Sequence, residues 1–152
     1  MVFVHMIVAG VIGSFLMSVV MTFIHRGGWA NADMIRAIGS LVTKSYENSF
    51  FPGIVIHHVV GALLAIPYTL ILEAIGIHSP VALAAVGATL GLFHGTAMSF
   101  VLLALVVDNH PVERFQRAGL GVAAANVAGH VAYGLGVGGA CAWMAIASGM
   151  TV

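Results

Sequence analysis

Four long apolar stretches constrain this chain more than any other feature. They cover residues 2–24, 53–75, 80–107 and 118–148, and each is long enough to cross a hydrocarbon core, which takes about 20 helical residues. The stretches are rich in Ala, Leu and Gly and lack the alternation of a membrane β-barrel strand. Since 61% of all residues are hydrophobic and 7% are charged, lipid is the natural solvent. We therefore predict an all-α fold, a single domain over residues 1–152 built as a bundle of four transmembrane helices.

The first apolar stretch is expected to stay in the protein as a helix. It opens with Met1-Val2-Phe3-Val4 and has no basic region before it, and no small-x-small cleavage site ends it. A basic region and a cleavage site are features of secretory signal peptides, and this stretch has neither. The single cysteine, Cys141, lies within an apolar run and is expected to be a buried small hydrophobe.

The basic residues predict how the helices are oriented. All five lie in two alternate loops, the first and the third, and they are Arg26, Arg36, Lys44, Arg114 and Arg117. Cytoplasmic loops carry an excess of Lys and Arg, so both loops are predicted to be cytoplasmic. The N-terminus, the turn near residues 76–80 and the C-terminus then lie on the outer side.

The first basic loop carries a helical pattern of its own. Within residues 33–44, apolar side chains recur at helical spacing, and Asn31 or Asp33 is available as an N-cap. We predict a short amphipathic helix lying in the cytoplasmic interface, with Trp29 as an anchor at headgroup level. A solvated loop is the alternative.

Glycines repeat at four-residue spacing in the last two apolar stretches. Gly87, Gly91 and Gly95 lie in the third stretch, and Gly134 and Gly138 lie in the fourth. Such stripes allow helices to approach closely, within the bundle or against a partner subunit. A glycine beside a histidine also clears room for a flat macrocycle, and the pattern alone does not separate these uses.

Eight histidines in so apolar a chain are the main functional clue, because ionisable groups inside the membrane tend to face a bundle interior, a cavity or a cofactor. His94 and His130 are predicted at matched depth near the midplane of adjacent helices, roughly 20 Å and 18 Å from the cytoplasmic edge. Two facing imidazoles are the axial ligands of a b-type haem. Alternatively, these histidines are structural, with His130 bonded to Asn126, Tyr133 or a backbone carbonyl.

A second group of histidines is predicted near the cytoplasmic surface. His57 and His58 begin the second apolar stretch, and His25 and His110 come from neighbouring loops. Together they could form a metal site, since imidazole ligands suit Zn, Cu or Fe. Neighbouring helix residues point about 100° apart, so one of His57 and His58 should face inward and the other sideways.

Several short motifs resemble a family of small four-helix bacterial membrane proteins of unknown function. The motifs are His57 or His58 followed by Gly61, Ala65 and Tyr68; Gly91-Leu92-Phe93-His94-Gly95; His110-Pro111; His130-Val131-Ala132-Tyr133-Gly134; and the segment 33–41. The resemblance implies the four-helix fold in a bacterial cytoplasmic membrane, and in such a membrane the orientation predicted from the basic loops makes the termini periplasmic. It brings no activity with it.

Two functions of different classes follow from these observations. In the first hypothesis the chain is an accessory subunit of a larger membrane complex, such as a redox or photosynthetic complex, or forms a homo-oligomer, and it packs through its glycine faces. Alternatively, it is a module that holds haem b, a chlorophyll-type or bacteriochlorophyll-type pigment, or a transition metal through midplane histidines. The second hypothesis uses the cofactor residues His94, His130, Gly91, Gly95 and Tyr133.

A small metal carrier or transporter is a third hypothesis. No Walker loop, serine triad arrangement or Cys-x-x-Cys motif occurs, so the sequence gives no support to an enzyme acting on its own. A formal net charge of zero argues against nucleic-acid binding.

Overall fold

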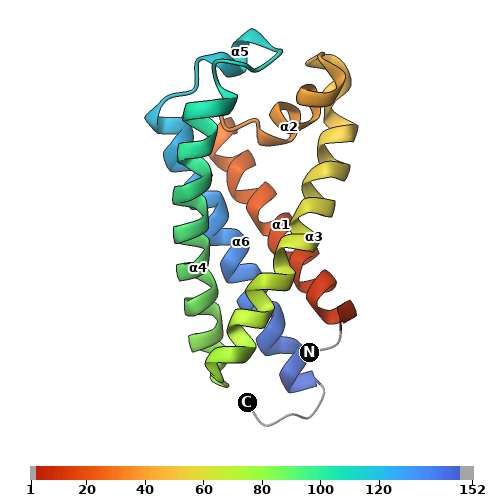
Figure 1. The fold of residues 1–152 in the computed structure, drawn as a ribbon, viewed down its shortest axis with the longest axis vertical. Helices are drawn as coiled ribbons and strands as arrows, with labels where there is room; N and C mark the ends of the chain where they lie inside the picture. Colours follow the sequence, from red (N-terminus) through yellow and green to blue (C-terminus); the bar gives the residue numbers. More distant parts are fainter. Residues whose placement is uncertain (1–2, 148–152) are drawn as a thin grey trace.

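The computed structural model describes residues 3–147, and its regular elements are all helical (Figure 1). Four helices are long and apolar enough to cross a membrane. They are α1 (Phe3–Arg26), α3 (Phe50–Ile75), α4 (Pro80–Val101) and α6 (Leu120–Ala147). This confirms the predicted all-α architecture with four candidate spans, and no strand occurs between residues 3 and 147.

The helix ends differ slightly from the predicted ones. α1 continues two residues beyond the expected end to Arg26, and α3 begins three residues early at Phe50. α4 ends earlier, at Val101, and passes into a π-helical segment, η2 (Leu102–Val106). This change in winding was not predicted from the sequence. The predicted ends at residues 2 and 148 lie outside the described part of the chain.

The two basic loops lie together at one end of the bundle, which we call the basic end (Figure 1). The first loop contains the short helix α2 (Met34–Thr43) and a 3₁₀ turn, η1 (Glu47–Ser49), and the second contains α5 (Glu113–Gln116). The predicted helix in the first loop is therefore confirmed, and Trp29 beside it is 79% exposed. Asp33, one of the two predicted caps, occupies the N-cap position of α2, but its side chain makes no capping hydrogen bond, and its carboxylate accepts one from the Tyr46 hydroxyl instead.

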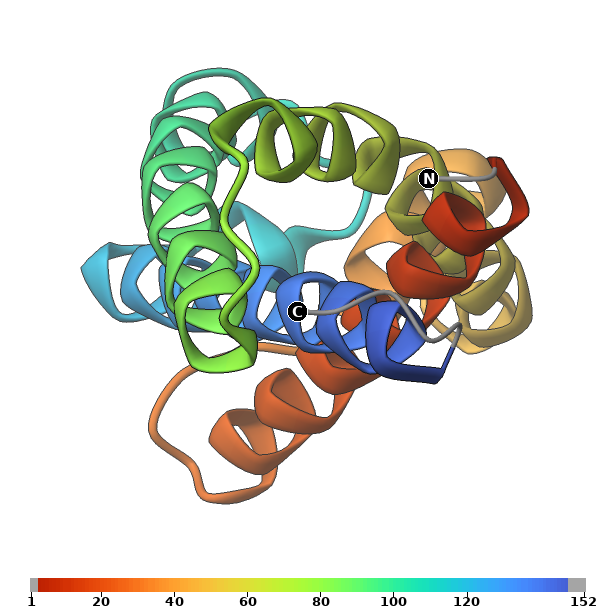
Figure 2. The same ribbon diagram turned by 90° about the horizontal axis from the view of Figure 1, so that it is seen from below.

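Close helix contacts follow the order α4–α6–α1–α3, with α6 between α4 and α1 (Figure 2). Each contact has glycine at its centre. A Cβ at Gly87 would overlap the Gly134 carbonyl group, and one at Gly136 would meet Gly13 Cα at 2.8 Å. Gly10 of α1 faces Gly61 of α3 in the same way. The glycine stripes therefore serve packing within the bundle, because small residues let the backbones touch.

The fourth side of the bundle has no such contact. A tight turn joins α3 and α4, and the two helices contact each other only near this turn. Towards the basic end they diverge (Figure 1). The physical reason is that glycine contacts hold α4 against α6 and α3 against α1. The divergence leaves space between α3 and α4.

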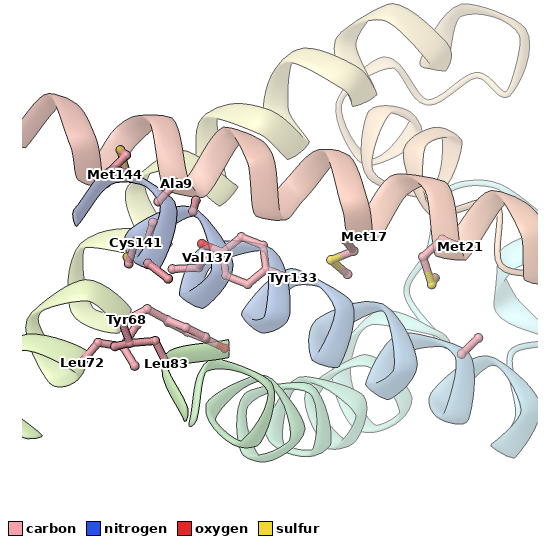
Figure 3. Packing of buried hydrophobic residues seen from close by; sticks show 14 of the residues in the cluster. Ala9, Met17, Met21, Tyr68, Leu72, Leu83, Tyr133, Val137, Cys141 and Met144 are labelled. Carbon is pink, nitrogen blue, oxygen red and sulfur yellow. The ribbon is translucent and has the colours of Figure 1, made fainter. Parts of the chain in front are cut away.

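The buried apolar core gathers around α6 in the half of the bundle opposite the basic end (Figure 3). Val137 and Ala9 are fully buried there, and Cys141 is 4% exposed, as expected for a small hydrophobe. Towards the basic end the packing between α1 and α6 thins to Met17 and Met21, whose side chains lie against Gly129. The well-packed half anchors the helices, and the open half holds the cavity described next.

Candidate functional site

A cavity of about 450 Å³ occupies the space between α3 and α4 and reaches from mid-bundle to the basic end. Most of its wall is aliphatic, with Met17, Met21 and Met98 among the lining residues. Polar side chains enter it at a few points, which is typical of sites for small molecules and cofactors. They are Asn31, Asp33, His57, His94, His110, Asn126, His130 and Tyr133.

His94 and His130 meet in the wall of this cavity. Their ring centroids are 4.8 Å apart and the rings stand at 73° to each other. His94 comes from α4 and His130 from α6, and their contact confirms the prediction that they lie at the same level of the bundle. The glycine contact between these helices makes the approach possible, because a Cβ at Gly95 would lie 2.7 Å from His130 Cβ.

One nitrogen of each ring is held by the protein. Nδ1–H of His130 donates to the Asn126 backbone carbonyl at 2.8 Å, and Nδ1 of His94 shares a hydrogen bond with the Tyr68 hydroxyl at 3.1 Å. These bonds fix the orientation of both rings. Among residues 3–147, neither Nε2 atom has a hydrogen-bond partner, so each ring keeps one nitrogen for a ligand.

The polar groups around the pair form a supporting network. The Tyr133 hydroxyl donates to the Gly61 carbonyl at 2.6 Å, which ties α6 to α3 beside the cavity. The Asn126 side chain donates to the Ser99 hydroxyl at 3.0 Å, and Ser99 in turn donates to the Gly95 carbonyl. Tyr68 and Ser99 were not predicted as part of this site. Their role follows from their contacts with His94 and Asn126, which are distant in the sequence.

For Gly91 and Gly95 the sequence left two uses open, helix packing and room for a macrocycle, and in the structure both glycines pack against α6. A Cβ at Gly91 would overlap the backbone carbonyl of His130. Neither glycine lines the cavity, whereas Tyr133, the other residue predicted beside the histidines, does. The two glycines act on the site indirectly, since they allow α6 to bring His130 against α4.

The other four candidate ligands do not form one cluster. Nε2–H of His57 donates to the Ser14 carbonyl, and Nδ1 of His58 shares a hydrogen bond with the Ser14 hydroxyl at 2.7 Å. His110 caps the cavity and His25 lies in a separate hollow. Across residues 3–147, no group of three or more His, Cys, Asp or Glu side chains is arranged to hold a metal ion. His57 faces inward and is 7% exposed, whereas His58 is half-buried, as predicted from the angle of about 100° between neighbouring helix residues.

The basic end closes over the cavity through contacts between the two loops. The Tyr46 ring lies between the guanidinium groups of Arg36 and Arg114, at 4.7 Å and 4.4 Å from its centroid. His110 donates from Nε2 to the Ala37 carbonyl of α2, and its ring stacks edge-on against Phe115. We call this set of contacts the cap. These contacts could not be recognised from the sequence, because they join two loops far apart along the chain.

The cap places Tyr46 in an unusual environment. Burial raises the pKa of its phenol above the ordinary value of 10.0, and the hydrogen bond to Asp33 and the charge of that carboxylate raise it further. The guanidinium groups of Arg114 and Arg36 lower this pKa and offset part of the effect.

The fold and the site together define a small polytopic membrane protein with a histidine-lined cavity. No family model, curated protein or solved structure matches the chain. The four-helix membrane class therefore stands on the helices themselves, and the resemblance noted in the motifs is not confirmed at the level of a family.

Proposed function

We propose that this chain is an intramembrane binding module that holds a metal-centred cofactor between His94 and His130. The observation that carries the proposal is the pair of imidazoles in one cavity wall, each with Nδ1 hydrogen-bonded and Nε2 free. Metal-ligating histidines typically make such a bond with the second ring nitrogen, since it fixes the tautomer and the ring direction. In His130 the proton lies on Nδ1, which leaves the Nε2 lone pair for a metal.

The ring geometry bears on the kind of cofactor. At a metal–nitrogen distance of about 2 Å, imidazoles on opposite faces of one metal hold their centroids roughly 6 Å apart, and imidazoles at about 100° hold them roughly 5 Å apart. The observed 4.8 Å favours two rings that approach one metal from the same side. A transition metal ion held by the two imidazoles, with its other positions taken by ligands from outside the chain, fits this spacing better than a haem between the rings, which requires the helices to separate.

The test begins with the protein isolated gently from its native membrane. Metal analysis and an absorption spectrum distinguish the candidates: bound metal without colour or with weak bands indicates an ion, a Soret band a haem, and a red Qy band a chlorophyll-type pigment. His94→Ala and His130→Ala should each remove most of the bound metal, whereas His5→Ala and His78→Ala should leave it in place. A parent protein without metal or tetrapyrrole contradicts the proposal.

The role of an accessory subunit is the second proposal. Since the glycine stripes are used inside the bundle, a partner has to contact another surface. The α4 span is the favoured one, because its burial of 17% is the lowest of the four, and Phe93 and Phe100 are exposed on it by 71% and 72%. If the chain is a subunit, Phe93→Ala with Phe100→Ala should release it from a larger particle in mild detergent. A particle of unchanged size argues against this surface.

A further inference from the structure

A second hollow lies at the basic end, between the end of α1, helix α2 and the start of α3. It has a volume of about 380 Å³ and is separate from the histidine pair. Unlike the main cavity, it has a wall rich in polar groups, among them Ser18, Thr22, His25, Arg26 and Arg36. The proposed cofactor does not use any of these residues.

Among the residues that the structure describes, no carboxylate pairs with the arginines of this hollow. Arg36 donates from Nη1 to the carbonyls of Tyr46 and Glu47, which leaves its Nε and Nη2 groups without a described acceptor. Arg26 has an exposed side chain and makes no hydrogen bond or ion pair with the residues that the structure describes. By contrast, Arg117 outside the hollow pairs with Glu113 at 2.6 Å.

His25 adds an unsatisfied polar atom. Its Nδ1 is buried and has no hydrogen-bond partner within residues 3–147. This nitrogen has almost no accessible surface, so a ligand in the hollow can bond to it only if the ring turns, and the arginines supply the donors that a ligand meets directly. Asp33 is the acidic residue of the wall, and its carboxylate is already engaged by the Tyr46 hydroxyl. With two arginines and one aspartate, the wall carries a formal charge of +1 when His25 is neutral.

We propose that this hollow binds the phosphate group of an anionic membrane lipid. Guanidinium groups and an imidazole N–H are donors that suit phosphate oxygens. The location favours a lipid over free phosphate, because Met21 and Phe50 form an apolar part of the wall and Phe23 on α1 is 71% exposed one turn before Arg26. Basic hollows between membrane helices on the cytoplasmic side commonly hold lipid headgroups.

The experiment measures the unfolding midpoint of the full purified chain in detergent during titration with dioleoyl phosphatidylglycerol. Dioleoyl phosphatidylcholine, with the same acyl chains, and inorganic phosphate are titrated in parallel. The anionic lipid should raise the midpoint, and the other two should not. Arg26→Gln should weaken the apparent affinity about fivefold, as expected for one cation near an anionic headgroup. Because its side chain has no partner to lose, this variant should fold normally.

Arg117→Gln is the matched control, since it removes the same charge from the same end but outside the hollow. It should bind the anionic lipid like the parent, whereas His25→Ala should bind it more weakly. Equal stabilisation by both lipids, or an equal loss in Arg26→Gln and Arg117→Gln, overturns the proposal. Saturation by inorganic phosphate at similar concentrations, if it depends on Arg26, overturns the assignment to a lipid. None of these results depends on whether His94 and His130 bind a metal.

Discussion

At the scale of single residues, two tyrosines near the histidine pair have different expected roles. The Tyr68 hydroxyl holds Nδ1 of His94, whereas the Tyr133 hydroxyl holds a backbone carbonyl of α3. Tyr68→Phe should therefore weaken metal binding by about 10–100-fold, which is usual for the loss of a partner that orients a ligating histidine. Competition with a metal chelator measures this affinity, and an unchanged value in Tyr68→Phe would show that His94 does not ligate.

Tyr133→Phe tests a hydroxyl that binds the backbone of α3 and does not orient a histidine. It removes the hydroxyl that donates to the Gly61 carbonyl, whose helical hydrogen bond within α3 remains, and should destabilise the protein by about 0.5–1.5 kcal/mol, the net contribution of one hydrogen bond. The free energy of unfolding in detergent measures the effect. Metal affinity should change much less than in Tyr68→Phe, so the pair of variants separates structural from orienting hydroxyl groups.

Gly91 tests the close approach of α4 and α6. A Cβ at this position would overlap the His130 backbone carbonyl, so Gly91→Ala should destabilise the fold by about 1–3 kcal/mol, as overpacking does. Gly139→Ala on α6 is the matched control, because a Cβ there has open space around it, and it should stabilise the helix by about 0.5–1 kcal/mol. Equal unfolding midpoints for the two variants would contradict the packing role of Gly91.

At the scale of elements, the cap should respond to alkaline pH. The pKa of Tyr46 is raised in the folded protein, chiefly by burial, so folding favours the neutral phenol. Its contribution to stability is complete below pH 10, the ordinary value, and is lost as the pH rises through the folded pKa. The difference in unfolding midpoint between the parent and Tyr46→Phe should therefore shrink above pH 10. A constant difference up to pH 11 would show that Tyr46 does not titrate in this way.

The helices also show which structural features can be predicted from the sequence. Length and hydropathy predict the four spans, and helical spacing predicts α2, because both patterns are local. Depth along a helix was enough to predict that His94 and His130 lie level, since rise per residue is constant. The divergence of α3 from α4 and the contacts of Tyr46, Arg36 and Arg114 could not be predicted. They depend on which glycine faces pair and on how two distant loops meet.

At the scale of the whole molecule, the cavity is a consequence of unequal helix contacts. Three interfaces are closed by glycines, and the pair α3 and α4 has no matching small residues along its length. The bundle is therefore tight at one end and open towards the basic end, where the cap covers it (Figure 1). A site formed in this way combines an apolar wall with a few fixed polar groups, without any broken helix.

The positions of the basic residues predict the orientation of the molecule in the membrane. All five Lys and Arg residues lie at the basic end, and the turn that contains His78 lies at the other end (Figure 1). Because positive loops stay in the cytoplasm, we propose that the basic end faces the cytoplasm of a bacterial cell. Single cysteines at the exposed positions His78 and Asn109 test it, in a Cys141→Ala background that removes the buried natural thiol.

A membrane-impermeant maleimide should label His78→Cys in intact cells and Asn109→Cys only after permeabilisation. The reverse result would mean that the bundle is inverted, and the hollow proposed to bind an anionic lipid would then lie in the outer leaflet. Labelling of both positions from the same side would contradict the spans themselves, since α4 and its π-helical end connect these two sites. The outcome also decides which compartment lies next to the cavity, because the cavity reaches the basic end and the tightly packed half separates it from the other end.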